Sequence, residues 1–505
     1  MTASPNDRIV SEFKKFCDGL IDSARESKPG TSAYEMEVSI YRQLLEIGAL
    51  ALEAYFESQA SHYHHATATI AEGRTLGYCG ERNGLFYSIF GNIRMKRSYY
   101  SDEGRGFFAM DAGLNLPPSG QSDFARMLVE ELSIDMSYEK ATTYLAKILR
   151  VQPSTRAVQT AIQTDSQDAE AFYEQAPAPA PCAEATILVV EADNKGVPMV
   201  NLPVERAAAE PTPGKPKGER KREGKTKEAT VVSVSTHVPY NRTPEQVRDS
   251  LFRDRTSKDK VHCDPREKPT FKRTWATMKG KAEGLAQADV WARQVMSPYI
   301  AFCIALTDGQ GSLQRRVDER FPDYVRILDL IHAIQYLWKA ADAQFGKGNK
   351  TGWLWVYDAV LRMLQGQTSQ IIAELDEWAN RTKDEARWGP IETSAGYFEK
   401  NLQAMKYDEY LAKGWPIATG IIEGACRHVI KDRCEQSGMR WTEQGVEAFL
   451  HLRCIHQNGD WDAYHTFRIK QRHERVYGIK STASHGFLDT DAYRFSTGQT
   501  YADAV

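Results

Sequence analysis

Two short apolar runs, each ending near an aspartate, constrain the fold of this chain most. They are TILVVEADNKGVPM, which contains Asp193, and YIAFCIALTDGQGSL, which contains Asp308. Both are rich in β-branched residues and have the length of a buried strand. We predict strands over 186–193, 197–203, 229–238, 299–307 and 325–331, with helices over 279–295 and 311–320. Strands that come first and then alternate with helices favour an α/β core.

A third acidic residue, Glu423, lies in the first turn of a predicted helix within WPIATGIIEGACRHVIKDRC. Three acids in such settings are typical of a two-metal carboxylate site, in which two Mg²⁺ or Mn²⁺ ions take hard oxygen ligands and promote phosphoryl transfer. Each acid also has a structural explanation. Asp193 and Asp308 suit turns, and Glu423 complements a helix dipole.

The helix that carries Glu423 also carries cations. At 3.6 residues per turn, Glu423, Arg427 and Lys431 share one stripe, and such cations suit a groove that holds phosphates. Arg433, Arg440 and Trp441 extend this predicted basic surface. The alternative is an i,i+4 pair between Glu423 and Arg427 that only stabilises the helix.

The amino-terminal part is predicted to be mostly helical. Helices are expected over 7–27 and 33–66, and the second has apolar residues that suit pairing with a second copy or packing within its own chain. A β-hairpin is expected over 82–100, around Gly91 and Asn92, and its cations and tyrosines suit either DNA contact or an ordinary exposed strand.

Three more helices follow, over 122–134, 138–149 and 155–170, each after a serine that can cap it. The last two suit a helix-turn-helix, with Arg156, Gln159 and Gln163 as base-reading residues. A helical hairpin without DNA is the alternative.

The net charge of the chain is −3, so any basic surface must be local. The densest cationic segment is PGKPKGERKREGKTKE, which includes Lys221 and Arg222. It is either a mobile arm that contacts phosphates or a solvated loop between two strands. No apolar run spans a membrane and no signal peptide opens the chain, so we expect a cytoplasmic protein.

The sequence resembles a known family. The runs ADNKGVPM, ALTDGQGSL, RILDLIHAIQYLW and YLAKGWPIATGIIEGACRHVIKDRCEQSGMRWTEQGVEAFLHLR are similar to those of the ISKra4 group of bacterial insertion-sequence transposases. The resemblance covers most of residues 75 to 475. It departs from the family at Ala418-Thr419-Gly420 and at Gly424, where Gly-Ser-Gly and Ser are expected.

The resemblance implies a DDE enzyme with a ribonuclease H-like mixed-sheet catalytic core and a large all-α insertion. Asp193 would end the first core strand, Asp308 would follow the fourth, and Glu423 would lie on the helix after the insertion. Asp329 and His332 would form an accessory element. There Asp329 would support a turn, and His332 would orient a group, contact a phosphate or be simply structural.

The expected organisation follows from these patterns. It comprises amino-terminal helices with a possible dimerisation role (1–75), a β-hairpin with the helix-turn-helix (76–175), a Pro/Ala-rich linker (176–185), the first part of the core (186–335), the insertion (336–415), the last part of the core (416–475) and a flexible tail (476–505).

The implied function is cleavage of transposon ends and strand transfer to target DNA. Double-stranded DNA and a second copy of the chain would be the partners, with no membrane, and the protein would associate with the bacterial nucleoid when bound to DNA. Two rivals remain: a ribonuclease H-like nuclease or resolvase that cuts without joining, and a non-catalytic DNA-binding protein derived from a transposase.

Overall fold

The computed structural model describes residues 5–70, 73–102, 105–200, 226–252, 267–382 and 384–478. The chain forms two compact units. The first comprises Met1–Glu130, Tyr138–Thr155 and His465–Val505, and the second comprises Glu131–Ser137 and Arg156–Tyr464.

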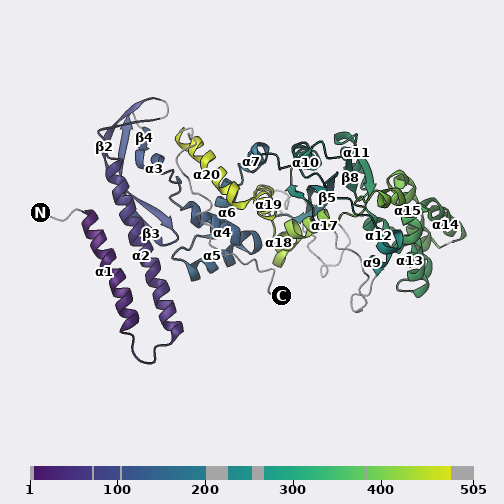
Figure 1. Ribbon diagram of the computed structural model, residues 1–505, viewed down its shortest axis with the longest axis horizontal. Coiled ribbons are helices and arrows are strands. Elements are labelled where there is room, and N and C mark those ends of the chain that lie inside the picture. Colours follow the sequence, from purple (N-terminus) through teal and green to yellow (C-terminus); the bar gives the residue numbers. More distant parts are fainter. Residues whose placement is uncertain are drawn as a thin grey trace, which may run out of the picture. The chain divides into compact units, whose positions relative to one another are not determined.

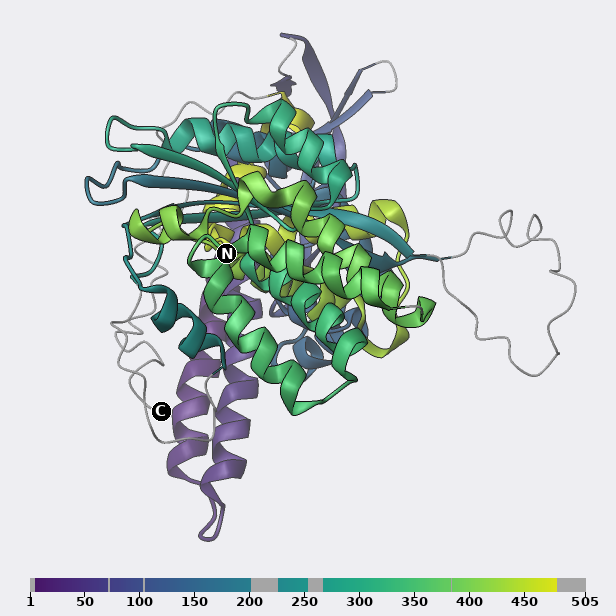
Figure 2. The same cartoon turned by 90° about the vertical axis from the view of Figure 1, so that its right-hand side faces the viewer.

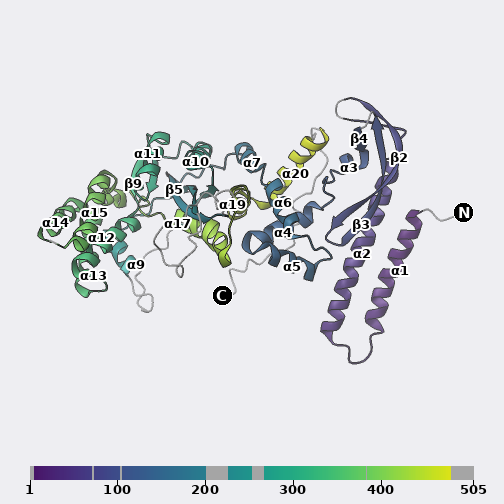
Figure 3. The ribbon, with the colours of Figure 1, turned by 180° about the vertical axis from the view of Figure 1, so that it is seen from behind.

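The first unit begins with a helical hairpin. Helix α1 (Pro5–Arg25) and helix α2 (Ala33–His62) run antiparallel, side by side, as Figures 1 and 3 show from opposite directions. Ser32 and Glu35 form a capping box that starts α2. Both predicted helices are therefore present.

A four-stranded antiparallel sheet follows in chain order, formed by β1 (Thr67–Thr69), β2 (Thr75–Ser88), β3 (Gly91–Asp102) and β4 (Arg105–Phe108). Phe56 of α2 packs against its core residues Ile93 and Met95. The predicted hairpin is present but longer, and its turn lies at residues 89–90 rather than at Gly91 and Asn92. Ser88 pairs with Gly91, whose φ of +113° suits glycine.

The predicted helices beyond the hairpin are also present, as α4 (Asp123–Asp135), α5 (Tyr138–Ile148) and α6 (Thr155–Asp165), after the short α3 (Ala109–Gly113). The last prediction is too long, because a turn at 166–168 ends α6 and a separate helix, α7 (Ala169–Gln175), follows. Residues 176–186 have no regular secondary structure and lie inside the second unit.

The second unit is α/β with a mixed sheet of five strands in the order β7-β6-β5-β8-β9. The strands are β5 (Ile187–Pro198), β6 (Thr226–His237), β7 (Phe271–Thr277), β8 (Phe302–Thr307) and β9 (Val325–Leu328). The pairs β5/β6 and β6/β7 are antiparallel, whereas β8 runs parallel to β5 and β9 parallel to β8.

Two strand predictions are wrong. Asp193 does not end its strand, because residues 194–198 continue to pair with β6 as far as Pro198 opposite Thr226. The predicted strand over 197–203 is absent as a separate element: its first two residues belong to β5, and 201–203 lie outside the described residues. The strand β7 was not predicted.

Helices cover both faces of this sheet. Helix α10 (Lys281–Val295) packs closely on one face, where Gly284 lies against Thr230 and Val232 of β6. The opposite face carries Ile187 and Val189, which share one apolar core with Leu337 and Phe398 of the helical segment described next. Helices α9 (Pro244–Phe252) and α11 (Gly311–Arg320) complete this part of the unit.

The predicted insertion, residues 336–415, is helical. It contains most of α12 (Leu330–Phe345), then α13 (Lys350–Leu364), α14 (Thr368–Arg381), α15 (Glu385–Asn401), η1 (Leu402–Ala404) and α16 (Tyr407–Ala412). Figure 2 shows these green helices gathered as one bundle. Among the described helices, none combines the length and apolar character that crossing a bilayer requires.

The last described part of the chain is a helical series: α17 (Gly420–Ala425), the π-helical η2 (Cys426–Lys431), α18 (Asp432–Cys434), η3 (Gln436–Gly438), α19 (Glu443–Gln457) and α20 (Trp461–Tyr477). The predicted tail from 476 falls almost wholly outside the described residues.

Candidate metal centre

Asp193 and Asp308 occupy matching positions, the first on strand β5 and the second directly after the neighbouring strand β8. Strands β5 and β8 pair in parallel up to Glu191 opposite Leu306, and Asp193 and Asp308 lie two residues further along. Residues in register on parallel strands point to the same face of a sheet, about 5 Å apart. The register therefore predicts that both carboxylates share one face, and the charge of Asp193 indeed raises the pKa of Asp308.

Helix α17 brings Glu423 to this face. The backbone N–H of Ile422, one residue before Glu423, donates to Glu191 Oε2 on β5 at 3.0 Å. The Cys426 thiol donates to Asp193 Oδ2 at 3.4 Å. Both contacts place the helix over the carboxyl half of β5, although 231 residues separate Glu191 from Ile422. The three acids that the sequence singled out thus come together.

Burial and mutual repulsion perturb two of these acids. Burial raises the pKa of Asp308, and the negative charge of Asp193 adds to that rise. Burial also raises the pKa of Glu423, with further rises from the charges of Asp329 and Asp193. A cluster of carboxylates that repel one another is destabilising unless a cation joins it.

Protein cations do not neutralise the cluster. Within the described ranges, no Lys or Arg forms an ion pair with Asp193, Asp308 or Glu423. His332 lies close enough to the cluster for its positive charge, when it is protonated, to lower the pKa of Asp308 and of Glu423. Carboxylates without a Lys or Arg partner fit Mg²⁺ or Mn²⁺.

Asp329 and His332 form a tight pair beside the three acids. Asp329 caps α12, and its Oδ2 accepts the His332 N–H at 2.9 Å and lies 2.6 Å from His332 Nδ1. Its Oδ1 accepts the Thr419 N–H at 2.7 Å. The hydrogen bond that the His332 ring donates to the Asp329 carboxylate raises the pKa of His332. The pKa of Asp329 is lowered although its burial opposes this, because His332 and Thr419 donate to it.

Ligand atoms of Asp329, His332 and Glu423 lie within 4.8 Å of one another, a spacing that a metal ion could bridge. The carboxylate of Asp329, however, is fully buried and already accepts three hydrogen bonds. We therefore assign Asp329 to support of the site. Asp193, Asp308 and Glu423 are the candidate metal ligands, because no Lys or Arg pairs with them among the described residues.

A second group with such spacing, Glu170, Glu447 and His451, lies elsewhere in the second unit. Its charges are already balanced. Lys279 Nζ pairs with Glu170 at 2.5 Å, and Glu447 Oε1 lies 3.0 Å from His451 Nε2. This group is an ion-pair network that joins α7, α19 and the end of β7.

Neighbouring side chains hold the loop after β8. Asp308 Oδ1 accepts the Gln310 N–H at 2.8 Å, and Asn194 Nδ2 donates to Gln310 Oε1 at 2.7 Å. The Tyr397 hydroxyl of α15 donates to the Asp308 carbonyl at 2.8 Å. A side chain at Gly309, where φ is +82°, would crowd Leu328 of β9 and Tyr397. The loop is therefore fixed from both the sheet and helix α15.

The helix of Glu423 is not the regular α-helix that the sequence suggested. Gly420–Ala425 is α-helical, Cys426–Lys431 is a π-helix, and the short α18 follows it. The predicted stripe of Glu423, Arg427 and Lys431 assumed 3.6 residues per turn and is wrong in that respect. Arg427 and Lys431 are nevertheless exposed, and Arg427 lies 3.7 Å from Asp432 rather than pairing with Glu423. Single-turn π segments frequently occur at functional sites.

Two members of the predicted basic surface are buried. Arg433 is 1% exposed, lies over the rings of Trp441 and Phe449, and donates to the Ser133 carbonyl. Trp441 is 8% exposed, and its backbone bridges to Met199. The prediction that they contact DNA is therefore corrected, because both fill the core under α19. Arg440 is exposed.

The predicted base-reading residues lie on α6 in the second unit, whereas α5 belongs to the first. Arg156 and Gln159 are exposed and Gln163 is half-buried. The amides of Gln159 and Gln163 lie beside Gly445, in the first turn of α19. Lys221 and Arg222 fall outside the described residues.

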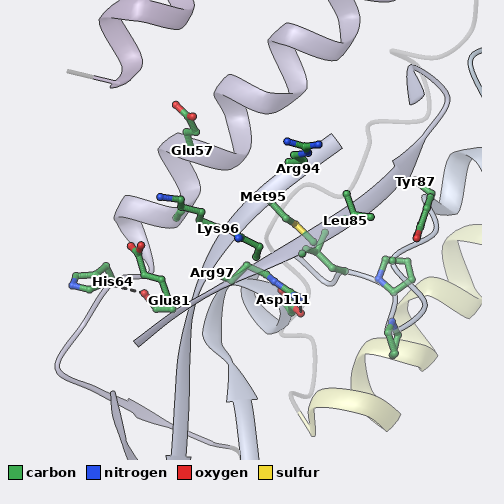
Figure 4. A pocket seen from close by; sticks show the side chains of 18 of the residues that line it. Glu57, His64, Glu81, Leu85, Tyr87, Arg94, Met95, Lys96, Arg97 and Asp111 are labelled. Atoms are coloured by element: carbon green, nitrogen blue, oxygen red, sulfur yellow. Dashed lines mark hydrogen bonds and ion pairs between the residues drawn. The ribbon is translucent and has the colours of Figure 1, made fainter. Parts of the chain in front are cut away.

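A groove of about 1260 Å³ lies on the first unit between α2, the β2/β3 hairpin and the loop 116–120 (Figure 4). Arg94 and Lys96 line it, but so do Glu57 and Glu81. Arg97 points to Asp111 and pairs with it at 2.5 Å. The groove is lined by both cationic and acidic side chains, so its charge does not by itself indicate a phosphate ligand.

Sequence reasoning missed three residues that support the site. Glu191 sits inside an apolar run, Cys426 follows Glu423 on the π segment, and Tyr397 lies in the insertion. A charged residue inside a strand that is otherwise apolar is the one signal that could have identified Glu191. Nothing in the local sequence distinguishes Cys426 or Tyr397.

Comparison of the sequence with protein-family models gives no match, and comparison with curated proteins gives none either.

Proposed function

We propose that this protein is a DDE transposase that cleaves transposon ends and transfers the cut strands to target DNA. The observation that carries the proposal is the meeting of Asp193, Asp308 and Glu423, without Lys or Arg partners among the described residues, on one face of a mixed sheet. These are oxygen ligands in a setting that favours a divalent cation.

The chain order of the second unit also supports a ribonuclease H-like core. Asp193 lies on β5, the first strand of the sheet, and Asp308 directly follows β8, the fourth strand in chain order. Glu423 lies on α17, after the helical segment α12–α16. This matches the arrangement implied by the resemblance to the ISKra4 group, apart from the extension of β5 beyond Asp193.

Asp193, Asp308 and Glu423 would hold two Mg²⁺ or Mn²⁺ ions, which supply Lewis acidity and an activated water for phosphodiester hydrolysis. The protein's own residues hold the acids in place. Gln310 and Tyr397 fix the Asp308 loop, and Asp329 with His332 anchors the start of α17. The hydrogen bond to Asp329 raises the pKa of His332, and the protonated imidazole would offset part of the negative charge of the cluster.

In the proposed reaction, water attacks a phosphodiester at the element end and leaves a 3′-hydroxyl. That hydroxyl then attacks a phosphodiester of the target strand and displaces another 3′-hydroxyl, so no protein nucleophile is needed. Exposed Arg427, Lys431 and Arg440 near α17 would contact phosphates. Bringing two ends together calls for at least a homodimer, and a bacterial cytoplasmic, nucleoid-associated location follows from the substrate.

The two rivals make different use of the same site. A nuclease or resolvase of similar fold would cut and release a 3′-hydroxyl without joining it. A DNA-binding derivative would have no need of three mutually repelling carboxylates, and their retention in one cluster favours an enzyme.

The test uses the full chain and a labelled duplex from the flanks of its own gene, with Mg²⁺. The transposase predicts nicking at the element boundary followed by joined products, and both disappear with EDTA or in Asp193→Ala. Cutting without joining favours the nuclease. Specific binding without cleavage favours the DNA-binding derivative.

A further inference from the structure

We infer that Glu191 is a positioning residue that sets where Glu423 lies relative to Asp193. The inference rests on the proposed function, in that it concerns the geometry of the same three-acid site. The observations behind the inference are hydrogen bonds between protein groups around the start of α17, and they can be tested without a bound metal ion.

The start of α17 lacks a cap of its own. Thr419 is the N-cap residue, but its side chain makes no capping hydrogen bond, and its buried hydroxyl has no hydrogen-bond partner in the described part of the chain. A helix start leaves several N–H groups without partners, and these require acceptors when they are buried.

Two carboxylates from elsewhere in the chain serve as the cap. Asp329 Oδ1 accepts the Thr419 N–H at 2.7 Å, and Glu191 Oε2 accepts the Ile422 N–H at 3.0 Å. Both acids are almost completely buried, at 0% and 2% exposure. A negative charge at the positive end of a helix is favourable, which offsets part of the cost of burying these carboxylates.

Glu191 ties this helix start to the strand that bears Asp193. It lies two residues before Asp193 and therefore on the same face of β5. Its Oε2 also accepts the Ser233 hydroxyl of β6 at 2.8 Å. The Glu191 carboxylate thus joins β5, β6 and α17. Its partner on the helix, Ile422, is the residue directly before Glu423.

The geometry makes a specific demand on the side chain. The Glu191 carboxylate must reach from the strand to the helix, so length matters more than charge. Glutamine keeps the reach and an acceptor oxygen, whereas aspartate keeps the charge but is one methylene shorter. Substitutions of residues that orient metal ligands typically weaken metal binding by about 10- to 100-fold.

The experiment compares the full-length wild type with Glu191→Gln, Glu191→Asp and the control Ser233→Ala, which removes another donor to the same carboxylate. Two quantities are measured: amide hydrogen exchange of residues 419–425, and Mn²⁺ affinity by titration. Thermal unfolding of each variant establishes that it is folded.

We expect Glu191→Asp to speed exchange of residues 420–425 by about tenfold, the loss of one buried hydrogen bond, and to weaken Mn²⁺ binding by at least about tenfold. In Glu191→Gln and Ser233→Ala, the exchange rate and the Mn²⁺ affinity should both stay within about threefold of the wild-type values. The inference is overturned if Glu191→Asp has the same amide exchange and the same Mn²⁺ affinity as the wild type. It is also overturned if Glu191→Gln loses as much exchange protection and Mn²⁺ affinity as Glu191→Asp does. Failure of the wild type to bind Mn²⁺ contradicts the proposed function instead, while the exchange data still decide the capping role.

Discussion

The hydroxyl of Tyr397, on helix α15, donates to the backbone carbonyl of Asp308 at 2.8 Å. Tyr397 also stacks on Tyr336 of α12, with ring centroids 3.7 Å apart. The helical segment α12–α16 therefore contacts the loop of one of the three acids directly. This contact makes the helical segment a structural part of the site as well as an addition to the sheet.

Tyr397→Phe should keep the stacked ring and lose only this hydrogen bond. We expect a loss of about 1 kcal/mol in unfolding free energy and weaker Mn²⁺ binding, because the loop after β8 gains freedom. Tyr299→Phe, at an exposed tyrosine, is the control. Unchanged Mn²⁺ affinity in folded Tyr397→Phe would contradict a role for the insertion in holding Asp308.

Asp308→Asn should stabilise the metal-free protein while abolishing its response to metal. Burial and the charge of Asp193 raise the pKa of Asp308, so its ionised form is unfavourable in the folded state. A raised folded-state pKa means that stability is lost as pH rises through that value, and the asparagine variant avoids this loss. Its gain, about 1 kcal/mol, should therefore appear near neutral pH and vanish below the ordinary carboxyl range.

Thermal unfolding with and without Mn²⁺ measures both effects. The wild type should gain about 2.7 kcal/mol at a metal concentration of 100 times Kd, and Asp308→Asn should gain almost nothing. An Asp308→Asn variant less stable than wild type without metal would show that the aspartate is structural.

Glu447 allows a pH test that is independent of the proposed reaction. Burial opposes its ionisation, but hydrogen bonds from His451, Met278 and Thr277 outweigh burial and lower its pKa. Stability from a lowered pKa is present above the ordinary glutamate value and is lost as pH falls through the folded-state value.

Glu447→Gln should therefore lower the unfolding free energy by about 1–3 kcal/mol at pH 7, and the difference from wild type should shrink as pH falls below 4.5. Urea unfolding between pH 3.5 and 7 measures this, and Glu443→Gln, at an exposed position on the same helix, is the control. A difference that does not change with pH would contradict the assignment.

Arg433 and Arg440 should respond oppositely to substitution. Removing the buried guanidinium in Arg433→Ala should destabilise the fold by about 3–5 kcal/mol, because its partners in the core lose their contacts. Arg440→Ala should change stability by less than about 0.5 kcal/mol but weaken DNA binding and its salt dependence. Equal stability of the two variants would contradict the burial of Arg433.

Local sequence patterns predicted which helices and strands are present better than they predicted the residues at which these begin and end. Serine caps and apolar periodicity located α2, α4 and α5 within a few residues. Strand β7 was missed because FKRTWAT carries two cations on its exposed half, so its alternation is weak. The end of β5 was placed too early because Asp193, Asn194 and Gly196 resemble a turn, whereas pairing with β6 keeps them extended.

The three acids were identified from local motifs and from the resemblance, but the residues that hold them in place were not identified from the sequence. Glu191 and Ile422 are 231 residues apart, and Tyr397 and Asp308 are 89 apart. Contacts at such separations depend on the folded topology and leave no mark on nearby residues. The same limit explains why Arg433 and Trp441, a cationic and an aromatic residue close in sequence to Glu423, were assigned to a surface although both are buried.

The most direct test of the metal centre is a count of bound Mn²⁺ by electron paramagnetic resonance, in the full-length wild type and in folded Asp193→Asn, Asp308→Asn and Glu423→Gln. The account predicts that the wild type binds up to two ions, that each substitution weakens or removes binding, and that Glu443→Gln leaves it unchanged. Wild-type Mn²⁺ binding in all three site variants, or none in the wild type, would contradict it.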